Sequence, residues 1–364
     1  MVRIWTFTYS RREKTHKNIL IVSSSAQKIW VGEGLNDGTL NVIFEKSGGG
    51  IYFKQRSTGT AGTWGSDVLI DATGTGCTLS INHTNNNLYC FYVKSLNVYY
   101  RVFDGSTWGS ETFYAKTTSS SIFANTLNSV RDCIGSVLCV WSTPDSKIEC
   151  GHKINIPVVK TSSDVLTATG AGARGTHPYG SHIGRQGTSI AASWIDRDWL
   201  AKFAVSKDGG TTWNTTISTN SAYGVVDDTA HDSPVLTIFN QYVYIMAYGF
   251  SFNSIVNPLK IWRTRYQIND EWFNNGEDLI EIALWDANVE IGYRHILMDQ
   301  AGIMYLVYAT NIGEKIAVRS YNGSSWGAET IILQISNTDY QPFSINAIMS
   351  QEATGQQSIH LIYT

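Results

Sequence analysis

One stretch of the sequence, residues 189–217, reads as a complete unit of two strands and a marked turn. Its first half alternates apolar and polar residues as a half-buried strand does, and a second apolar segment follows a short polar turn. The next turn is Ser-Lys-Asp-Gly-Gly-Thr-Thr-Trp, residues 206–213. In this turn the Asp208 carboxylate can accept amide hydrogen bonds, the glycines allow positive φ, and Trp213 offers a large apolar plate. The unit predicts antiparallel strands joined by tight turns.

Weaker copies of this turn recur along the chain, each ending in a Trp: Trp64, Trp108, Trp272 and Trp326. The marked positions lie about 50 residues apart, except that the gap between Trp108 and Trp213 is twice as long. That gap therefore holds an unmarked unit, centred on residues 136–160. The two chain ends together supply a second unmarked unit, so the repeats indicate seven units of about 52 residues each.

A second repeat supports this count. Each unit contains an apolar strand that ends in an aromatic residue just before a polar turn: Phe44, Tyr92, Trp141, Trp194, Tyr248, Tyr308 and Tyr363. No room for a further strand follows the last of these. Residues 2–9 and 18–22 are therefore expected to complete the unit that the C-terminal strands begin. Such pairing would remove free sheet edges and hold both chain ends.

The octet at residues 206–213 resembles the Asp box, S-x-D-x-G-x-T-W, of the sialidase-like (BNR-repeat) β-propellers and matches it at each fixed position. With the repeats, this resemblance implies an all-β fold: a seven-bladed β-propeller of four-stranded antiparallel blades, closed by pairing of the N- and C-terminal strands. Six blades is the alternative, and residues 1–364 would form one domain. The resemblance makes Ser206, Asp208, Gly210 and Trp213 structural, because active sites of this superfamily lie on the opposite face.

The composition limits the kinds of molecule that this chain is expected to bind. The formal net charge is −3 and only 16% of residues are charged, so the sequence lacks the basic footprint of a nucleic-acid-binding protein. It has no apolar run of membrane-spanning length and no recognisable signal peptide. We expect a monomeric glycan-binding protein without cofactor, in an extracellular or virion-associated setting. The five cysteines are expected to be buried free thiols, and residues 162–187 to form a loop.

Polar residues gather where the innermost strands should begin: Arg131, His182, His231, Asp232, Tyr293, Arg294 and His295. In a propeller these positions converge on the mouth of the central channel, on the face away from the Asp boxes. Residues 227–249 and 293–309 also resemble His-containing first-strand segments of BNR-type polysaccharide lyases such as ulvan lyases. This second resemblance covers two blades.

The lyase resemblance implies β-elimination at a uronic acid, in which a base removes the proton α to a neutralised carboxylate. His and Tyr suit proton transfer near neutral pH, and Arg suits a bidentate hold on a carboxylate. The expected base is His231 or His295, and the expected acid is Tyr248 or Tyr308. The expected carboxylate clamp is Arg294 or Arg131. The remaining expected substrate contacts are His182, Asp232, Tyr293 and Arg197.

Four alternatives remain open. A sialidase could use Arg131, Arg197 and Arg294 as its arginine triad, with Asp196 or Asp232 as acid. A glycosidase could draw two carboxylates from Glu45, Asp145, Asp196 and Asp232. A divalent ion could bind Asp227, Asp228, His231 and Asp232, although no metal is expected. Finally, the chain could be a non-catalytic glycan-binding or structural propeller, such as a viral tail or surface protein, in which the histidines and tyrosines only pack the blades.

Overall fold

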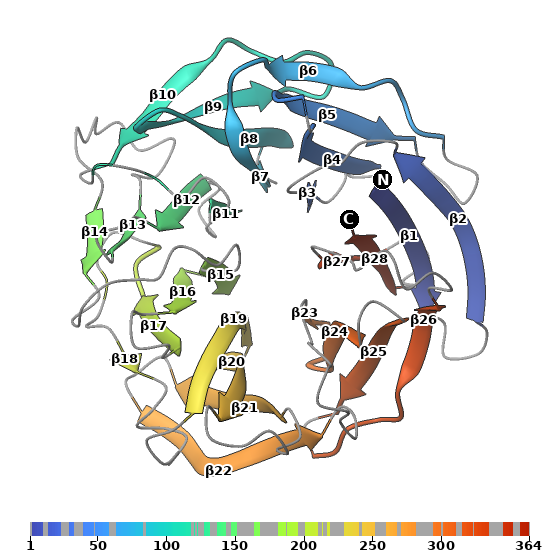
Figure 1. Ribbon diagram of the computed structural model, residues 1–364, viewed down its shortest axis with the longest axis vertical. Coiled ribbons are helices and arrows are strands. Elements are labelled where there is room, and N and C mark those ends of the chain that lie inside the picture. The colour runs from blue at the N-terminus through green and yellow to red at the C-terminus, as the bar shows by residue number, and fades with distance from the viewer. Residues whose placement is uncertain are drawn as a thin grey trace.

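The computed structural model shows seven four-stranded antiparallel sheets in the part of the chain that it describes. The described residues are 2–9, 14–22, 29–32, 39–46, 48–57, 63–82, 85–117, 120, 122, 127–131, 137–142, 147–150, 164–167, 181–186, 188–195, 201–209, 213, 217–218, 229–239, 242–251, 260–267, 271–281, 294–299, 301–310, 315–322, 324–334, 345–351 and 357–363. Figure 1 shows the sheets arranged in a ring. This is the arrangement of a β-propeller, so the all-β propeller prediction is confirmed.

Six sheets each use four consecutive strands, which follow one another from the inside of the ring outward. Sheets I and II contain β3 (Ile29–Gly32), β4 (Leu40–Glu45), β5 (Ile51–Arg56), β6 (Val68–Asp71), and β7 (Thr75–Asn82), β8 (Asn87–Lys94), β9 (Asn97–Phe103), β10 (Thr112–Lys116). Sheets III and IV contain β11 (Asn128–Arg131), β12 (Val137–Ser142), β13 (Lys147–Cys150), β14 (Asp164–Thr167), and β15 (Ser181–Gln186), β16 (Ser189–Ile195), β17 (Ala201–Ser206), β18 (Ile217–Ser218). Sheets V and VI contain β19 (Thr229–Phe239), β20 (Tyr242–Ser251), β21 (Lys260–Gln267), β22 (Glu271–Glu281), and β23 (Arg294–Met298), β24 (Met304–Thr310), β25 (Lys315–Tyr321), β26 (Thr330–Gln334).

Sheet VII joins the two ends of the chain. Its order is β27 (Ile345–Gln351), β28 (Gln357–Tyr363), β1 (Val2–Tyr9) and β2 (Lys14–Val22). Strand β1 pairs with β28 on one side and with β2 on the other. The innermost strand of each sheet contacts those of its two neighbours, from β3 through β7, β11, β15, β19, β23 and β27 back to β3. The sheets therefore follow one another around the ring in the order of the chain.

The inner strands approach one another closely. A Cβ atom added to Gly184 of β15 would lie 2.7 Å from Leu236 Cδ1 on β19. A side chain at this position would have to displace Leu236, so the glycine allows sheets IV and V to approach closely. Buried apolar side chains pack between these two sheets and also between sheets I and II, II and III, and VI and VII.

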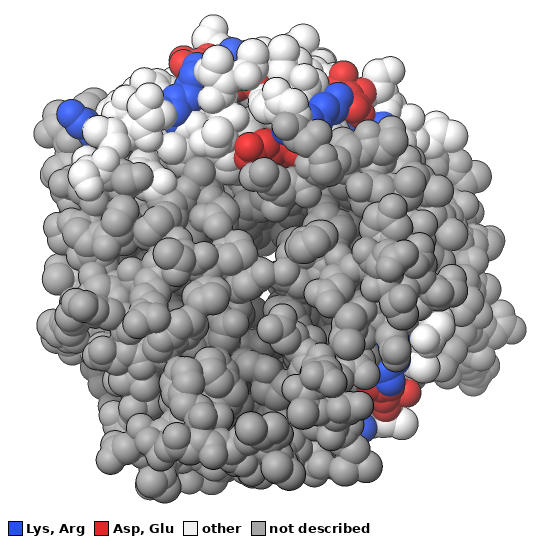
Figure 2. Space-filling model, in the orientation of Figure 1, with Lys and Arg blue, Asp and Glu red and all other residues white. Residues whose placement is uncertain are grey.

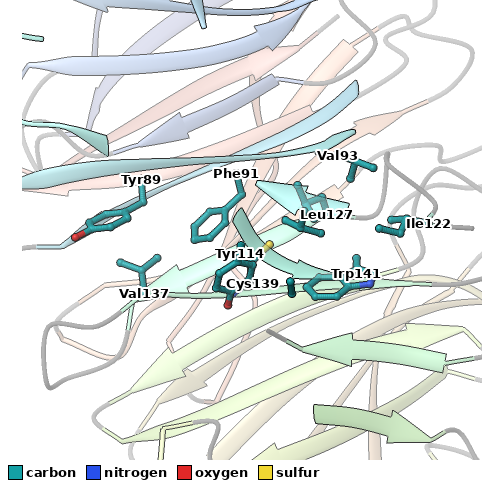
Figure 3. Close-up of a cluster of buried hydrophobic side chains, with 11 residues drawn as sticks. Tyr89, Phe91, Val93, Tyr114, Ile122, Leu127, Val137, Cys139 and Trp141 are labelled. Atoms are coloured by element: carbon teal, nitrogen blue, oxygen red, sulfur yellow. The ribbon is translucent and has the colours of Figure 1, made fainter. Parts of the chain in front are cut away.

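The junction of sheets II and III shows this packing. Phe91, Tyr114 and Trp141 are fully buried, and the ring centroids of Phe91 and Tyr114 lie 4.9 Å apart (Figure 3). Tyr114 comes from the outer strand of sheet II, while Trp141 comes from β12 of sheet III. The aromatic residues that repeat in the sequence all lie on the second strand of their sheet. Wherever their burial is described, at Phe44, Tyr92, Trp141 and Tyr308, they are buried.

The structure tests two further predictions, on the cysteines and on residues 162–187. Cys77, Cys90 and Cys139 are buried and form no disulfide, as predicted for these three. The prediction that residues 162–187 form a loop is wrong, because this segment contains β14 and β15. The short apolar pair Val165 and Leu166 is enough to build the outer strand β14, which pairs with Glu149 and Ile148.

Candidate functional site

The expected polar residues and tyrosines lie opposite one another on the inner two strands of sheets V and VI. Asp232 on β19 pairs with Tyr248 on β20, and Arg294 on β23 pairs with Tyr308 on β24. Because β19 contacts β23, these two pairs occupy corresponding places on neighbouring sheets.

The three histidines do not share one register position. Ser181 and Arg294 lie opposite the aromatic residues Trp194 and Tyr308, so His182 and His295 both follow that position by one residue. His231 instead precedes Asp232, the residue opposite Tyr248. Measured from the residue opposite the aromatic position, His231 is therefore displaced by two residues from the other two histidines. The sequence could not predict this offset, because only strand pairing sets the register.

His295 and Tyr308 are the predicted catalytic residues whose side chains the structure describes. His295 is half-buried with its Nδ1 atom fully enclosed, and this burial lowers its pKa to about 4, which keeps it neutral at neutral pH. Tyr308 is fully buried, and its hydroxyl donates a hydrogen bond of 2.6 Å to Glu329 Oε2. Burial, and then this carboxylate, raise the pKa of Tyr308 well above its usual value.

The structure describes only some of the other residues that were expected to contact the substrate. Arg131 ends the inner strand β11, opposite Val137. Outside the described residues lie Tyr293, Arg197, Asp227, Asp228, Asp145, Asp196 and Gly210.

In the part of the chain that is described, no group of three or more His, Cys, Asp and Glu could hold a metal ion. Nor does that part contain a helix long and apolar enough to cross a membrane.

The Trp turns of sheets II and VI share one geometry. In sheet II, the Asp104 carboxylate accepts hydrogen bonds of 2.8 Å from the backbone amides of Ser106 and Thr107. Asn322 takes the same part in sheet VI, with bonds from the amides of the corresponding residues. In the Asp-box turn of sheet IV, Ser206 Oγ donates to Asp208 Oδ1 at 2.8 Å. In each case a polar side chain holds the turn by local hydrogen bonds.

The Asp-box turn also identifies the face on which it lies. The amide of Gly209 donates a 2.7 Å hydrogen bond to the carbonyl of Thr188, which connects β15 to β16. The turn after the third strand and the turn after the first strand are therefore at the same end of the sheet. The starts of the inner strands, near which His182, His231, Asp232, Arg294 and His295 lie, are at the opposite end. The prediction that Arg131 begins an inner strand is wrong, because β11 starts at Asn128 and Arg131 ends it, at the end of its sheet that corresponds to the Asp-box turn of sheet IV.

A cluster that the sequence reasoning missed lies on the outer half of sheet II. Glu111 Oε2 accepts hydrogen bonds from Lys94 Nζ at 2.8 Å and from the Tyr92 hydroxyl at 2.7 Å. Two residues after Glu111, Phe113 is 49% exposed and meets the Tyr99 ring edge-on at 5.9 Å. A half-exposed carboxylate, an ammonium group and an open aromatic ring thus lie together. The signal was present as Trp-Gly-x-(Asp/Glu) after three of the Trp turns.

Lys94 also links this cluster to sheet I. Its Nζ lies 2.9 Å from Asp71 Oδ2, at the end of β6. Asp71 Oδ1 accepts bonds from the amides of Thr73 and Gly74 at 2.9 and 2.7 Å. Burial raises the pKa of Asp71, but the bonds from Lys94 and the two amides outweigh burial and lower the pKa to about 2. At the same junction, Glu45 accepts a 2.8 Å bond from the amide of Gly76.

The low pKa of Asp71 predicts an acid-dependent contribution to stability. A carboxyl whose pKa is lower in the folded chain stabilises the fold above its unfolded pKa, near 3.8, and loses this effect as pH falls toward 2. We expect Asp71→Asn to melt below the parent at pH 6, with the difference shrinking between pH 4 and 2. Thermal melts across this range measure it. A difference that stays constant with pH would contradict the assignment.

Comparison with known proteins adds a likeness of fold. No family model matches the sequence, and no characterised protein matches it in sequence. A mutant of NanB sialidase from Streptococcus pneumoniae superposes with a TM-score of 0.52 at 7% identity, covering 81% of this chain and 67% of that one. The six-bladed fungal lectin of Aleuria aurantia, described with a fucose recognition mode, gives a TM-score of 0.46 at 11% identity, covering 84% and 94%.

Proposed function

We propose that this chain, which has the sialidase-like β-propeller fold, is a carbohydrate-recognising protein. NanB, which shares the fold, is a sialidase and so acts on a glycan. Fold alone does not determine function, so the proposal rests on side chains of this chain. The observation that carries it is the sheet II cluster of Glu111, Lys94 and Phe113.

The chemistry of this cluster suits a sugar ring. A pyranose presents hydroxyl groups at its edges and C–H groups on its faces. Carboxylate oxygens of Glu111 can accept from hydroxyl groups, while the Lys94 ammonium can donate to them. The exposed ring of Phe113 offers a flat apolar surface to the C–H face. Charged neighbours also surround this part of the surface without forming a patch of one sign (Figure 2).

A glycan-binding screen tests the proposal. The full chain is labelled and applied to an array of neutral, sialylated and uronate-containing glycans, and hits are measured by calorimetry. We expect saturable binding to at least one glycan class, with binding at the sheet II cluster weakened at least tenfold by Glu111→Ala. The matched control is Asp104→Asn, which removes a carboxylate of the same sheet outside the cluster and introduces the residue type that takes the same part in sheet VI at Asn322. If no glycan is bound, the proposal is wrong.

Lyase-type β-elimination on a uronate-containing polysaccharide is the second candidate. The corresponding positions of the Asp232–Tyr248 and Arg294–Tyr308 pairs on contacting sheets favour it. His231 is the preferred base, because the low pKa and enclosure of His295 make that imidazole a weak proton acceptor. Tyr248 is the preferred acid, because Tyr308 already donates its hydroxyl proton to Glu329. Arg294 would hold the substrate carboxylate.

Elimination produces an unsaturated uronate that absorbs in the ultraviolet, which gives a direct assay. If His295 were the base, the rate should rise near pH 4, so a rise at clearly higher pH would favour His231 instead. We expect His231→Ala to abolish turnover without changing the melting temperature, and Arg294→Ala to raise KM as well. Binding of uronate polysaccharides without any unsaturated product would leave the chain a binding protein and exclude the lyase.

The seven sheets also support a finer proposal on architecture, namely one closed ring of seven blades in a single domain. Sheet VII supplies the closing blade, since it combines strands from both ends of the chain. In this arrangement the mouth of the ring and the outer half of each blade are separate surfaces. The lyase candidate uses the first surface, and the sheet II cluster lies on the second.

A further inference from the structure

We infer that the sheet II cluster is one of three equivalent sites for a neutral pyranose, the other two lying on sheets I and VI. This inference rests on the proposed carbohydrate recognition and adds the number of sites and the class of sugar. We call the three groups the rim clusters: Lys46, Tyr52, Lys54, Asp67 and Leu69; Lys94, Tyr99, Arg101, Glu111 and Phe113; Lys315, Ala317, Arg319, Glu329 and Ile331.

The three clusters share one backbone frame. Trp64, Trp108 and Trp326 each form an isolated bridge back to the last residue of the third strand of their sheet. The glycine that follows each Trp donates an amide hydrogen bond of 2.7 or 2.8 Å to the same strand. The carboxylate residue comes two positions after that glycine. The frame therefore places Asp67, Glu111 and Glu329 at one position relative to their sheets.

The sheet I cluster repeats the contacts of sheet II. Asp67 lies 2.9 Å from Lys46 Nζ and 3.0 Å from Lys54 Nζ. The Lys46 ammonium lies 3.8 Å from the centre of the Tyr52 ring, as Lys94 lies over Tyr99 at a longer distance. Leu69 is 51% exposed and lies directly opposite Tyr52. Carboxylate, ammonium and open apolar group are again neighbours.

The sheet VI cluster keeps the carboxylate, the cation and the exposed apolar residue, but its lysine comes from another position and Ala317 stands where the other two clusters have a tyrosine. Lys315 Nζ lies 2.6 Å from Glu329 Oε1, but Lys315 begins the third strand, whereas Lys94 ends the second strand. Ile331 is 48% exposed and lies opposite Ala317. The cation and carboxylate are therefore retained together although the lysine occupies a different position.

A purely structural role accounts for only part of this pattern. Half-exposed ion pairs contribute little to stability, so they do not require an apolar neighbour. Yet Leu69, Phe113 and Ile331, each two residues after the carboxylate, are all apolar and about half exposed. The other marked turns give a contrast, because Thr216 and Asn275 stand three residues after Trp213 and Trp272, where a carboxylate would be. The pattern predicts three sites rather than five.

The charges of the clusters indicate a neutral ligand. Each ammonium group already lies within ion-pair distance of a carboxylate, and the Glu111 cluster adds Asp71 to its single lysine. The clusters of sheets I and VI hold two cations to one carboxylate, but each ammonium is already paired with that carboxylate, so an anionic sugar would have to compete with it. Hydroxyl groups, in contrast, can both accept from the ammonium and donate to the carboxylate. The geometry thus favours neutral pyranoses over uronates and sialates.

Methyl-labelled protein tests the inference directly. The full chain, with ¹³C-labelled Ile and Leu methyl groups, is titrated with methyl glycosides of galactose, glucose, mannose and fucose, and with glucuronate and N-acetylneuraminate. We expect one or more neutral glycosides to shift the methyl signals of Leu69 and Ile331 together, with dissociation constants within about threefold of each other. Calorimetry should give three sites, and Phe113→Ser should leave two.

The variant arm separates this inference from the broader proposal. The triple variant Leu69→Ser, Phe113→Ser and Ile331→Ser should lose neutral-glycoside binding at least tenfold. The control Val68→Ser, at a 44% exposed neighbour on β6, should bind as the parent does. Glycan binding that leaves both methyl signals and the triple variant unaffected, or that prefers the anionic sugars at these residues, would overturn the three-site inference alone. If the parent binds no glycan, both proposals fail.

Discussion

Removal of the first ten residues should lower the melting temperature on the order of 10 °C. The deletion takes away β1, which pairs with β28 on one edge and with β2 on the other. Sheet VII would keep β27 and β28 but lose the strand that connects them to β2. Every backbone hydrogen bond of β1 disappears, and β2 and β28 gain unpaired edges. Thermal unfolding followed by circular dichroism measures the effect.

Adding the missing strand as a separate peptide provides the control. A synthetic peptide of residues 1–10 should bind the truncated protein and restore most of the lost melting temperature, because it can occupy the gap between β28 and β2. A peptide with the same composition in scrambled order should not. A truncated protein that melts like the full chain would show that sheet VII does not depend on β1, contrary to its pairing.

The sequence predicted the fold through features that act locally. The Asp-box octet folds its own turn by hydrogen bonds from Ser206 to Asp208, and the aromatic residue that ends each second strand is buried in the packing between sheets wherever its burial is described. Because these features depend only on residues that are close in the sequence, they can be recognised without knowing which strands pair. Strand β14 was missed because a short outer strand contributes few apolar residues of its own.

The candidate sites depended on information that is not local. The positions of His182, His231 and His295 relative to their partner strands follow from register, which a letter pattern does not contain. The bond between Tyr308 and Glu329 joins residues from different parts of the sheet, so the sequence could not show that this tyrosine hydroxyl is already engaged. The rim clusters were readable as Trp-Gly-x-(Asp/Glu), but the exposure of Phe113 and its counterparts became apparent only from the folded chain.

Packing between blades, rather than within them, should dominate stability, and Phe91→Ala tests this. Phe91 is fully buried in a cluster that joins sheet II to Val137, Cys139 and Trp141 of sheet III (Figure 3). Removing the ring loses its transfer free energy and leaves a cavity, which together cost about 3–5 kcal/mol. Denaturant titration should show this loss as a lower free energy of unfolding.

Phe113→Ala is the matched control, since it removes the same atoms from the same sheet at a 49% exposed position. Its expected cost is within about 1 kcal/mol, because the ring is only half withdrawn from water and leaves no enclosed cavity. If the rim clusters bind sugar, the two variants should also differ in function. Phe113→Ala should lose a sugar site while keeping its stability, and Phe91→Ala should lose stability while the remaining folded protein binds as before. Equal destabilisation by the two changes would contradict the burial that places Phe91 between the blades and Phe113 at their rim.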